Sequence, residues 1–208
     1  MNVLDRCPVV PVVVLDRADQ ALPLARALLA GGIDVIEVTL RTAAGLPGIE
    51  ALAGLDEMLV GAGSVVTPEH VDAVVDAGAE FVVSPGTSAA VLQQSAQRGV
   101  PAVPGTSSAS DLMVCAAADV TEVKVFPAAL LGGPAHIAAL AAPFPQMRFM
   151  PSGGVSAATM NDYLALSCVP AISGSWMVAP QLLREERWHD VTTLATEAVQ
   201  GARVALGA

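Results

Sequence analysis

The stretch LARALLAGGIDVIEVTLRT (residues 24–42) contains one complete helix-to-strand unit of an α/β protein. Its first part is rich in Ala and Leu, which favour a helix, and the pair Gly31-Gly32 follows where that helix would end. The β-branched run at 34–40 is typical of a strand. The sequence therefore predicts a helix, a glycine cap and a strand in succession.

The same order recurs along the chain. Val/Ile-rich runs, each followed by turn residues and an Ala-rich segment with helical spacing, predict strands at 9–15, 34–40, 57–64, 80–86, 101–106, 122–128, 148–154 and 171–176. Strands that alternate with helices typically form a parallel sheet. Thr67-Pro68, Ser107 or Ser108, and Ser156 are typical helix starts. Eight such units predict one α/β domain, residues 1–208, folded as a (β/α)₈ TIM barrel. A doubly wound open sheet is the alternative.

Composition excludes several classes of function. The 208 residues carry a formal net charge of −10, and no cluster of Lys or Arg could neutralise a run of phosphates, so we expect no nucleic-acid partner. An uncharged segment lies between Lys124 and Arg148, but its prolines and the pair Gly132-Gly133 would break a continuous helix. We therefore expect no membrane span.

The thiols and imidazoles suggest neither a disulfide framework nor a metal site. Cys7, Cys115 and Cys168 are far apart and odd in number, which favours a reduced, cytoplasmic setting. The three histidines share no metal-ligand spacing, so we assign no metal.

Lys124 is the sole lysine of the chain and stands between two valines in an expected strand. Because strand side chains alternate, Lys124 and Phe126 should share the inner face, as should Glu37 and Arg41 in the second strand. A buried ion is costly unless it is paired or serves a ligand. An ion pair that only satisfies the core is one interpretation, but three ionisable groups with the sole lysine favour a ligand site.

The last two expected strands end in glycine-rich turns. SGG (152–154) and SGSW (173–176) offer backbone N–H groups at the edge where barrel enzymes bind ligands, and a helix beginning near Ser156 would add its positive end. This combination predicts a phosphate site, with ordinary tight turns as the alternative.

Six segments together resemble the family of 2-dehydro-3-deoxy-6-phosphogluconate (KDPG) aldolases, which includes 4-hydroxy-2-oxoglutarate aldolases. They are LARALLAGGIDVIEVTLRT, VGAGSV, FVVSPG, KVFPA, RFMPSGGVS and SGSW, and the resemblance runs from about Pro8 to the final helix. It implies a metal-independent class I aldolase of the Entner–Doudoroff route, which needs no cofactor and is typically a homotrimer. Such an enzyme cleaves its phosphorylated keto-acid substrate to pyruvate and glyceraldehyde 3-phosphate through a lysine Schiff base.

The resemblance also implies a role for each matching residue. Lys124 would be the Schiff-base lysine and Glu37 the proton-transfer residue, while Arg41, with Ser64 beside it, would bind the substrate carboxylate. Pro85 and Phe126 would wall the pocket, and the phosphate would be surrounded by Ser152, Gly153, Gly154, Gly174 and Ser175.

Four positions depart from the family pattern. Ser64 and Ser152 stand where threonine is common, Ala129 stands where glutamate is common, and Ser173 replaces the first glycine of a GGSW motif. The two serines keep a hydroxyl, whereas Ala129 and Ser173 leave the substrate preference open.

Three alternatives follow from these departures and from the fold. One is an aldolase for 4-hydroxy-2-oxoglutarate or 2-dehydro-3-deoxy-6-phosphogalactonate. Another is a phosphate-binding isomerase or epimerase, in which Glu37 abstracts a proton and Lys124 acts only as an electrophile. The third is a metabolite-binding barrel without activity.

Overall fold

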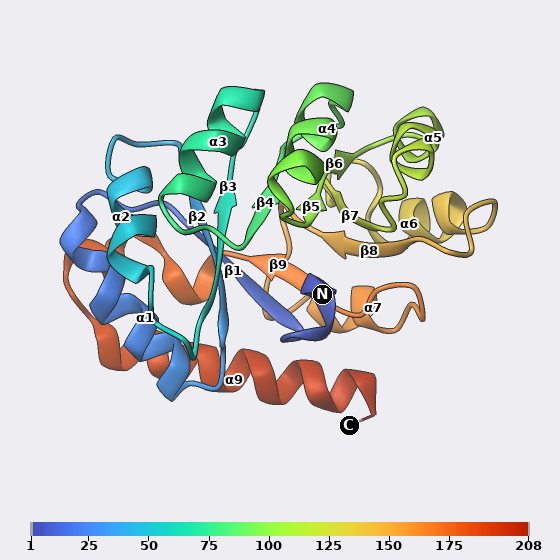
Figure 1. Ribbon diagram of the computed structural model, residues 1–208. Helices are drawn as coiled ribbons and strands as arrows, with labels where there is room; N and C mark the ends of the chain where they lie inside the picture. The colour runs from blue at the N-terminus through green and yellow to red at the C-terminus, as the bar shows by residue number, and fades with distance from the viewer. Residues whose placement is uncertain (1, 208) are drawn as a thin grey trace.

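The computed structural model describes residues 2–207 and has parallel strands in its interior with helices around them (Figure 1). The strands form two parallel sheets, of six strands in the order β5-β4-β3-β2-β1-β9 and of three strands in the order β6-β7-β8. Their bounds are β1 Val9–Val13, β2 Val35–Thr39, β3 Leu59–Gly63, β4 Phe81–Val83, β5 Ala102–Val103, β6 Gly105–Thr106, β7 Glu122–Val125, β8 Arg148–Pro151 and β9 Ile172–Gly174. The predicted α/β architecture with parallel strands is confirmed.

The strand expected at 101–106 is divided at Pro104. Proline has no N–H to donate to a strand ladder, and the ladder changes partner here, since β5 pairs with β4 whereas β6 pairs with β7. The carbonyl of Pro104 accepts a hydrogen bond of 2.9 Å from the Lys124 N–H, so this short segment joins the two sheets. At the other border, the Phe149 N–H donates to the Cys168 carbonyl before β9 begins. The sheets therefore curl into a barrel-like arrangement, without a ladder between β8 and β9 in the described residues.

The helices follow the strands in the expected alternation. They are α1 Ala21–Ala30, α2 Gly45–Leu52, α3 Pro68–Asp76, α4 Ala89–Arg98, α5 Ala109–Ala117, α6 Gly133–Ala141, α7 Met160–Leu164, α8 Pro180–Arg184 and α9 Trp188–Leu206, with 3₁₀ turns η1 Val3–Asp5, η2 Ala18–Gln20 and η3 Trp176–Val178. The long α9 packs on α1 and α7 and lies across one side of the molecule (Figure 1).

Two of the predicted helix starts are confirmed and one is wrong. Thr67 accepts from the His70 N–H at the start of α3, and Ser108 caps α5. Ser156, in contrast, forms a turn with Thr159, and α7 begins only at Met160. The short α7 thus starts beyond the SGG turn and does not bring its positive end to that turn.

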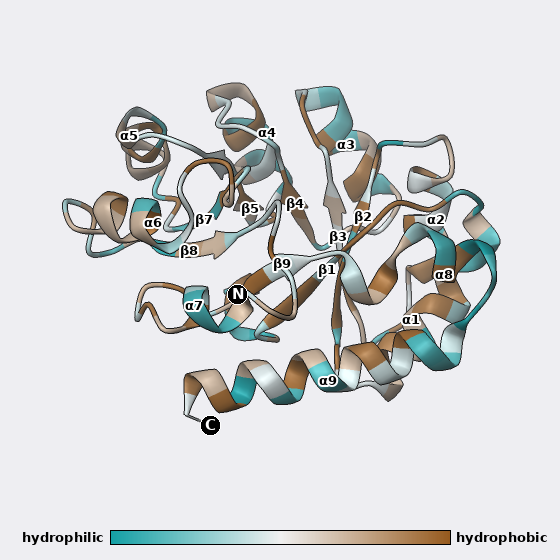
Figure 2. Cartoon of the chain, turned by 180° about the vertical axis from the view of Figure 1, so that it is seen from behind, coloured by the Kyte–Doolittle hydropathy of each residue, from teal (hydrophilic) through white to brown (hydrophobic). Residues whose placement is uncertain are grey.

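The core consists of strands buried on both faces. Every residue of β2 and β3 is buried, as expected for parallel strands covered by helices. Figure 2 shows mostly hydrophobic colours on the central strands, whereas α9 alternates hydrophobic and hydrophilic residues along its length. Amphipathic helices of this kind bury one stripe and expose the other.

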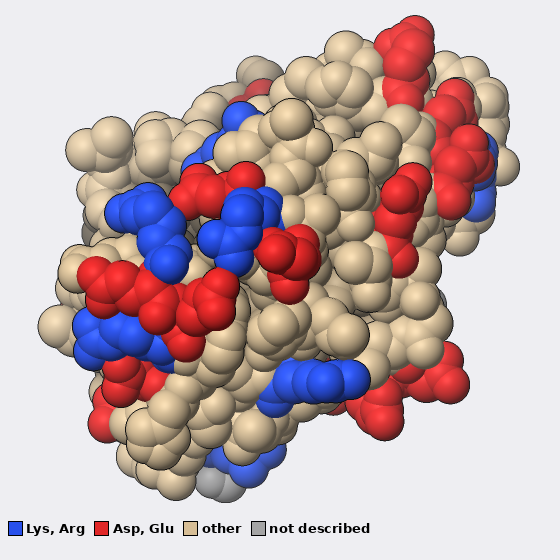
Figure 3. All heavy atoms as spheres, turned by 90° about the vertical axis from the view of Figure 1, so that its left-hand side faces the viewer, with Lys and Arg blue, Asp and Glu red and all other residues tan. Residues whose placement is uncertain are grey.

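Charged side chains lie mostly outside this core. On the face drawn in Figure 3, Lys and Arg lie among Asp and Glu, with large uncharged areas between them. Arg17, for example, pairs with Asp19 and Glu186. Across residues 2–207, none of the helices combines the length and the apolar character needed to cross a membrane.

Glu122 at the start of β7 fixes the N-terminal segment to the three-stranded sheet. Its carboxylate accepts from the Val3 N–H at 2.8 Å, from the Leu4 N–H at 3.4 Å and from Arg148 Nη1 at 2.8 Å. Burial raises the pKa of the Glu122 carboxyl, and the hydrogen bond from Val3 and the charge of Arg148 only partly offset that effect. The folded protein therefore holds this proton more tightly than the unfolded chain does.

We expect the stability difference between the protein and its Glu122→Gln variant to depend on pH. A raised pKa in the folded state stabilises the fold fully below the ordinary value of 4.5, and this contribution is lost as the pH rises through the folded pKa. Gln cannot titrate, so the free energy of unfolding of the protein relative to the variant should fall as pH increases. Urea unfolding of both proteins from below pH 4.5 upward measures this difference in the free energy of unfolding. A difference that grows in favour of the unmodified protein as the pH rises would contradict the raised pKa of Glu122.

Candidate active site

Lys124 and Glu37 form an ion pair in the interior of the fold. Lys124 comes from β7 and Glu37 from β2, which belong to different sheets, and Lys124 Nζ lies 3.1 Å from Oε1 and 3.2 Å from Oε2 of Glu37. The two residues are only 4% and 1% exposed. Both side chains therefore point inward, as strand alternation predicts.

Glycines on β3 make room for this pair. Gly63 pairs in register with Thr39 on β2, and a Cβ at Gly63 would overlap the Glu37 carboxylate. A Cβ at Gly61 would likewise overlap the Phe81 ring. A side chain at either glycine would displace an inward-pointing group, so these positions shape the interior around Glu37.

Arg41 lies at the mouth of the same interior. It follows β2, is exposed, and its Nε donates to Ser64 Oγ at 3.2 Å. Ser64 follows β3 in a left-handed conformation with φ 61°. The predicted pairing of Arg41 with Ser64 is present, and the guanidinium keeps four further N–H donors for an anion.

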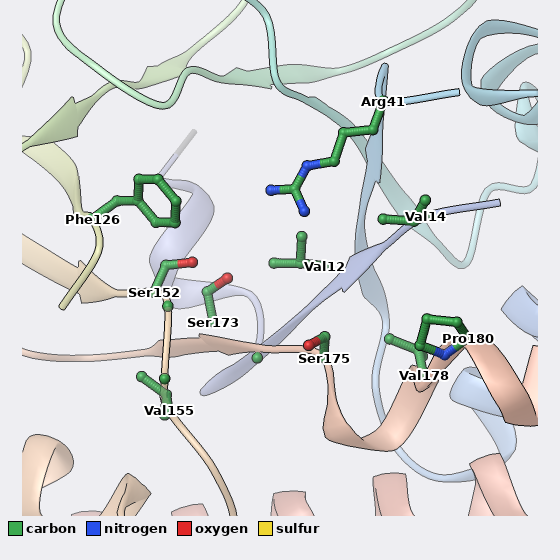
Figure 4. A pocket seen from close by; sticks show the side chains of 13 residues that line it. Val12, Val14, Arg41, Phe126, Ser152, Val155, Ser173, Ser175, Val178 and Pro180 are labelled. Carbon is green, nitrogen blue, oxygen red and sulfur yellow. The ribbon is translucent and has the colours of Figure 1, made fainter. Parts of the chain in front are cut away.

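A pocket of about 260 Å³ opens beside these groups. Figure 4 shows the Arg41 and Phe126 side chains reaching toward it from opposite sides, with Ser152 and Ser173 between them and Ser175 nearer to Val178. It is lined by Val12, Val14, Arg41, Phe126, Ser152, Gly153, Gly154, Val155, Ser173, Gly174, Ser175, Val178 and Pro180. Lys124 Nζ lies 5.6 Å from the centre of the Phe126 ring, which places the ion pair next to this pocket.

The glycine-rich turn after β8 has a backbone that other residues rarely adopt. Gly153 and Gly154 have φ values of 88° and 80°. A Cβ at Gly154 would also overlap the side chain of Ala129, so the segment after β7 packs directly on this turn. Substitution of either glycine would strain the turn that lines the pocket.

The structure brings together most of the predicted site residues. Lys124, Glu37, Arg41 and Ser64 lie around the pocket opening or directly behind it, and the pocket wall contains Phe126, Ser152, Gly153, Gly154, Gly174 and Ser175. Pro85 is the exception, because it is exposed and lines a separate hollow with Val65 and Val66. The role of Pro85 in the wall of the substrate site stays a prediction.

Several lining residues carry little signal in the sequence. Val12, Val14, Val155, Val178 and Pro180 are apolar residues at strand ends or turns, and only strand alternation in β1 points to the first two. In the sequence, Ser173 stands out only as a departure from the family motif. It is fully buried, and its Oγ is the sole buried side-chain N or O atom in residues 2–207 without a hydrogen-bond partner.

The donor set suits carbonyl and anion chemistry. It contains a buried amine, a carboxylate within hydrogen-bond distance of that amine, a guanidinium and several hydroxyls. Within the described part of the chain, no three His, Cys, Asp or Glu side chains are grouped so that they could hold a metal ion. An amine paired with a proton acceptor is the arrangement that imine formation requires.

Comparison with known proteins places the whole chain in one family. A family model described as KDPG and KHG aldolase matches residues 1–194. The KHG/KDPG aldolase of Escherichia coli (strain K12) is 43% identical over 204 residues, covering 98% of this chain and 96% of that protein. The 2-dehydro-3-deoxy-phosphogluconate aldolase of Dickeya dadantii is 40% identical, covering 97% of this chain and 95% of that protein.

A solved structure gives the same answer. KDPG aldolase from Legionella pneumophila, with pyruvate captured at low pH as a covalent carbinolamine intermediate, superposes with a TM-score of 0.91 at 38% identity, covering 94% of this chain and 96% of that one. The chain therefore belongs to the family of KDPG and KHG aldolases.

Proposed function

We propose that this protein is a class I aldolase that cleaves 2-dehydro-3-deoxy-6-phosphogluconate to pyruvate and glyceraldehyde 3-phosphate through a Schiff base on Lys124. The observation that carries this assignment is the buried Lys124–Glu37 pair beside a pocket that has Arg41 at one side and glycine-rich turns at another. Family membership supports it, because the relatives carry the names of such aldolases.

In the first half of the reaction, the protonated Lys124 amine gives one proton to Glu37, and the free amine adds to the C2 carbonyl of the substrate. A second proton passes from the nitrogen to the oxygen, which forms the carbinolamine. Glu37 then returns a proton to the carbinolamine oxygen, which leaves as water and produces an iminium ion. Arg41 can grip the substrate carboxylate with two parallel hydrogen bonds, which holds C2 against the amine.

In the second half, the iminium accepts electrons from the C3–C4 bond. Glu37, directly or through water, takes the proton of the C4 hydroxyl, so that C4 leaves as the aldehyde of glyceraldehyde 3-phosphate. Glu37 passes this proton to C3 of the remaining enamine, and hydrolysis of the imine releases pyruvate and restores the lysine amine. Contacts of the phosphate with Gly153, Gly154, Gly174 and Ser175 supply binding energy at the remote end.

Treatment of the protein with pyruvate and borohydride tests the covalent step. Reduction should leave one pyruvate-derived group fixed on Lys124, which peptide mass spectrometry would locate. An isomerase or epimerase in which the lysine acts only as an electrophile would gain no adduct. If no adduct forms on Lys124, the Schiff-base assignment is wrong.

Cleavage of 4-hydroxy-2-oxoglutarate is a second candidate activity. The name KHG/KDPG aldolase of the Escherichia coli relative covers two substrates, and the substrate carboxylate, C2 and C4 hydroxyl would use the same Arg41, Lys124 and Glu37. Comparing the turnover of the two substrates and of the galactonate epimer decides the preference.

Ser175→Ala should weaken the use of phosphorylated substrate specifically. The Ser175 hydroxyl lines the pocket at the end of β9, and hydrogen bonds to a charged group contribute about 1.5–3 kcal/mol. We expect kcat/KM for the phosphorylated substrate to fall about tenfold or more, with little change for its unphosphorylated analogue. An unchanged ratio of the two values would refute the phosphate assignment.

Three further features belong to the same proposal. We infer that the two sheets close into a complete (β/α)₈ barrel and that residues 1–208 form one domain, supported by a continuous apolar core from Val3 to Ala202. We also propose a cytoplasmic location, which suits the free thiols of Cys7, Cys115 and Cys168.

A homotrimer is the proposed assembly. An apolar groove of about 540 Å³ between α4 and α5 supports it, lined by Ala89, Leu92, Gln93, Ala96, Met113, Val114, Ala117 and Ala118. Met113 is 65% exposed there, and apolar surface of this kind is typical of contact sites between proteins. Light scattering in solution measures the subunit count.

A further inference from the structure

Ser173 occupies the inner face of β9, on the side of the reacting groups. It pairs in register with Val10 on β1, and Val12, two residues further on, pairs with Glu37 on β2. Since side chains two residues apart share a face, Ser173 points to the same interior as Glu37. Figure 4 shows its hydroxyl directed toward the pocket that Arg41 and Ser175 also line.

The Ser173 hydroxyl differs from the other buried hydroxyls of the barrel strands. Thr39 Oγ1 donates to the Val13 carbonyl at 2.8 Å, and Thr106 Oγ1 donates to the Lys124 carbonyl at 3.2 Å. Ser173 is 0% exposed, and within residues 2–207 its Oγ has no partner. A buried hydroxyl without a partner is unfavourable, which indicates that its partner is a ligand in the pocket.

The proposed substrate has one polar group for which no protein partner has yet been assigned. This step rests on the proposed function, in which Arg41 binds the carboxylate, Lys124 attacks C2 and Glu37 serves the C4 hydroxyl. The phosphate lies at the glycine-rich turns, so the hydroxyl on C5, next to the phosphorylated carbon, remains. It falls between the two ends of the substrate, and Figure 4 shows Ser173 beside Ser152, in the same pocket as Arg41 and Ser175.

We propose that Ser173 is a specificity-determining residue whose hydroxyl binds the C5 hydroxyl of the substrate. After cleavage, this is the hydroxyl on C2 of glyceraldehyde 3-phosphate. Ser173 would thus select acceptor aldehydes that carry a hydroxyl next to the carbonyl carbon, because an acceptor without it leaves the buried Ser173 oxygen unpaired.

The test measures aldol addition of pyruvate to two phosphorylated aldehydes. These are glyceraldehyde 3-phosphate and its analogue without the C2 hydroxyl, 3-hydroxypropanal phosphate, which keeps the phosphate. The protein should favour the first by about tenfold or more in kcat/KM. Ser173→Ala and Ser173→Gly should lose this advantage by lowering kcat/KM for glyceraldehyde 3-phosphate, while kcat/KM for the analogue stays unchanged.

Two controls separate this inference from misfolding and from failure of the proposed function. Ser173→Ala should melt no lower than the unmodified protein, because it removes a buried hydroxyl without a partner. Both Ser173 variants should still form the reduced pyruvate adduct on Lys124, because pyruvate has no such hydroxyl. If the unmodified protein forms no adduct, the proposed function fails first.

Three outcomes would overturn the role of Ser173 itself. The unmodified protein could use both aldehydes with equal kcat/KM, and this result alone would contradict the proposal without any variant. The Ser173 variants could lose activity with both aldehydes alike, which would indicate a structural or phosphate-binding role. Finally, Ser152→Ala could remove the selectivity while Ser173→Ala leaves it intact. The substrate C5 hydroxyl would then bind the hydroxyl of Ser152 and not that of Ser173.

Discussion

Lys124→Ala should reduce aldol cleavage by about 10⁴-fold or more, the order of loss found when a covalent nucleophile is removed. Lys124 is the sole lysine of the chain, so no neighbouring ε-amine can take its place. A coupled assay that reduces the released pyruvate to lactate follows the cleavage, and mass spectrometry after borohydride treatment should find no adduct. Cleavage within tenfold of the original rate would contradict the Schiff-base mechanism.

Lys124→Ala could lose activity because it unfolds, so two further variants are needed as controls. Lys124 and Glu37 are buried together, and removing one partner of such a pair costs about 3–5 kcal/mol because the other charge stays uncompensated. Lys124→Arg keeps a positive charge near Glu37 but cannot form the imine, and Lys124→Ala combined with Glu37→Gln removes both charges. All three variants should be inactive. Lys124→Ala should melt at the lowest temperature, because only this variant leaves the Glu37 charge uncompensated.

Strand alternation accounts for the part of the site that the sequence predicts well. The positions of Lys124 and Glu37 on their strands place both side chains inside, and an inward lysine needs a partner that an inward glutamate can supply. Which strands face each other across the interior is a property of the curled sheets, so the distance of 3.1 Å between Nζ and Oε1 could not be predicted from alternation alone.

The differences from prediction have local causes. Pro104 divides one expected strand because it lacks an N–H, and Ser156 forms a hydrogen-bonded turn with Thr159 instead of capping a helix. Periodicity defines the ends of helices and strands only to within a few residues, so it could predict neither the division at Pro104 nor the later start of α7.

Glu37→Gln should slow cleavage by about 10²–10⁴-fold, the usual contribution of a positioned general acid or base. Gln has nearly the shape of Glu and fits the space that Gly63 leaves free, but a neutral amide cannot take the proton of the lysine or of the C4 hydroxyl. The Schiff base forms more slowly for the same reason, so the rate of borohydride trapping with pyruvate should fall as well.

A step that uses pyruvate alone separates the catalytic role of Glu37 from a purely structural one. An aldolase of this kind exchanges the methyl protons of pyruvate with deuterium from the solvent through the enamine, and proton NMR follows that exchange. Glu37→Gln should slow the exchange together with cleavage, whereas Glu37→Asp, which keeps the carboxylate on a shorter stem, should recover part of both rates. If Glu37→Gln exchanged and cleaved at the original rates, the carboxylate would only neutralise Lys124 in the core, and the proton transfers would have to belong to water held in the pocket.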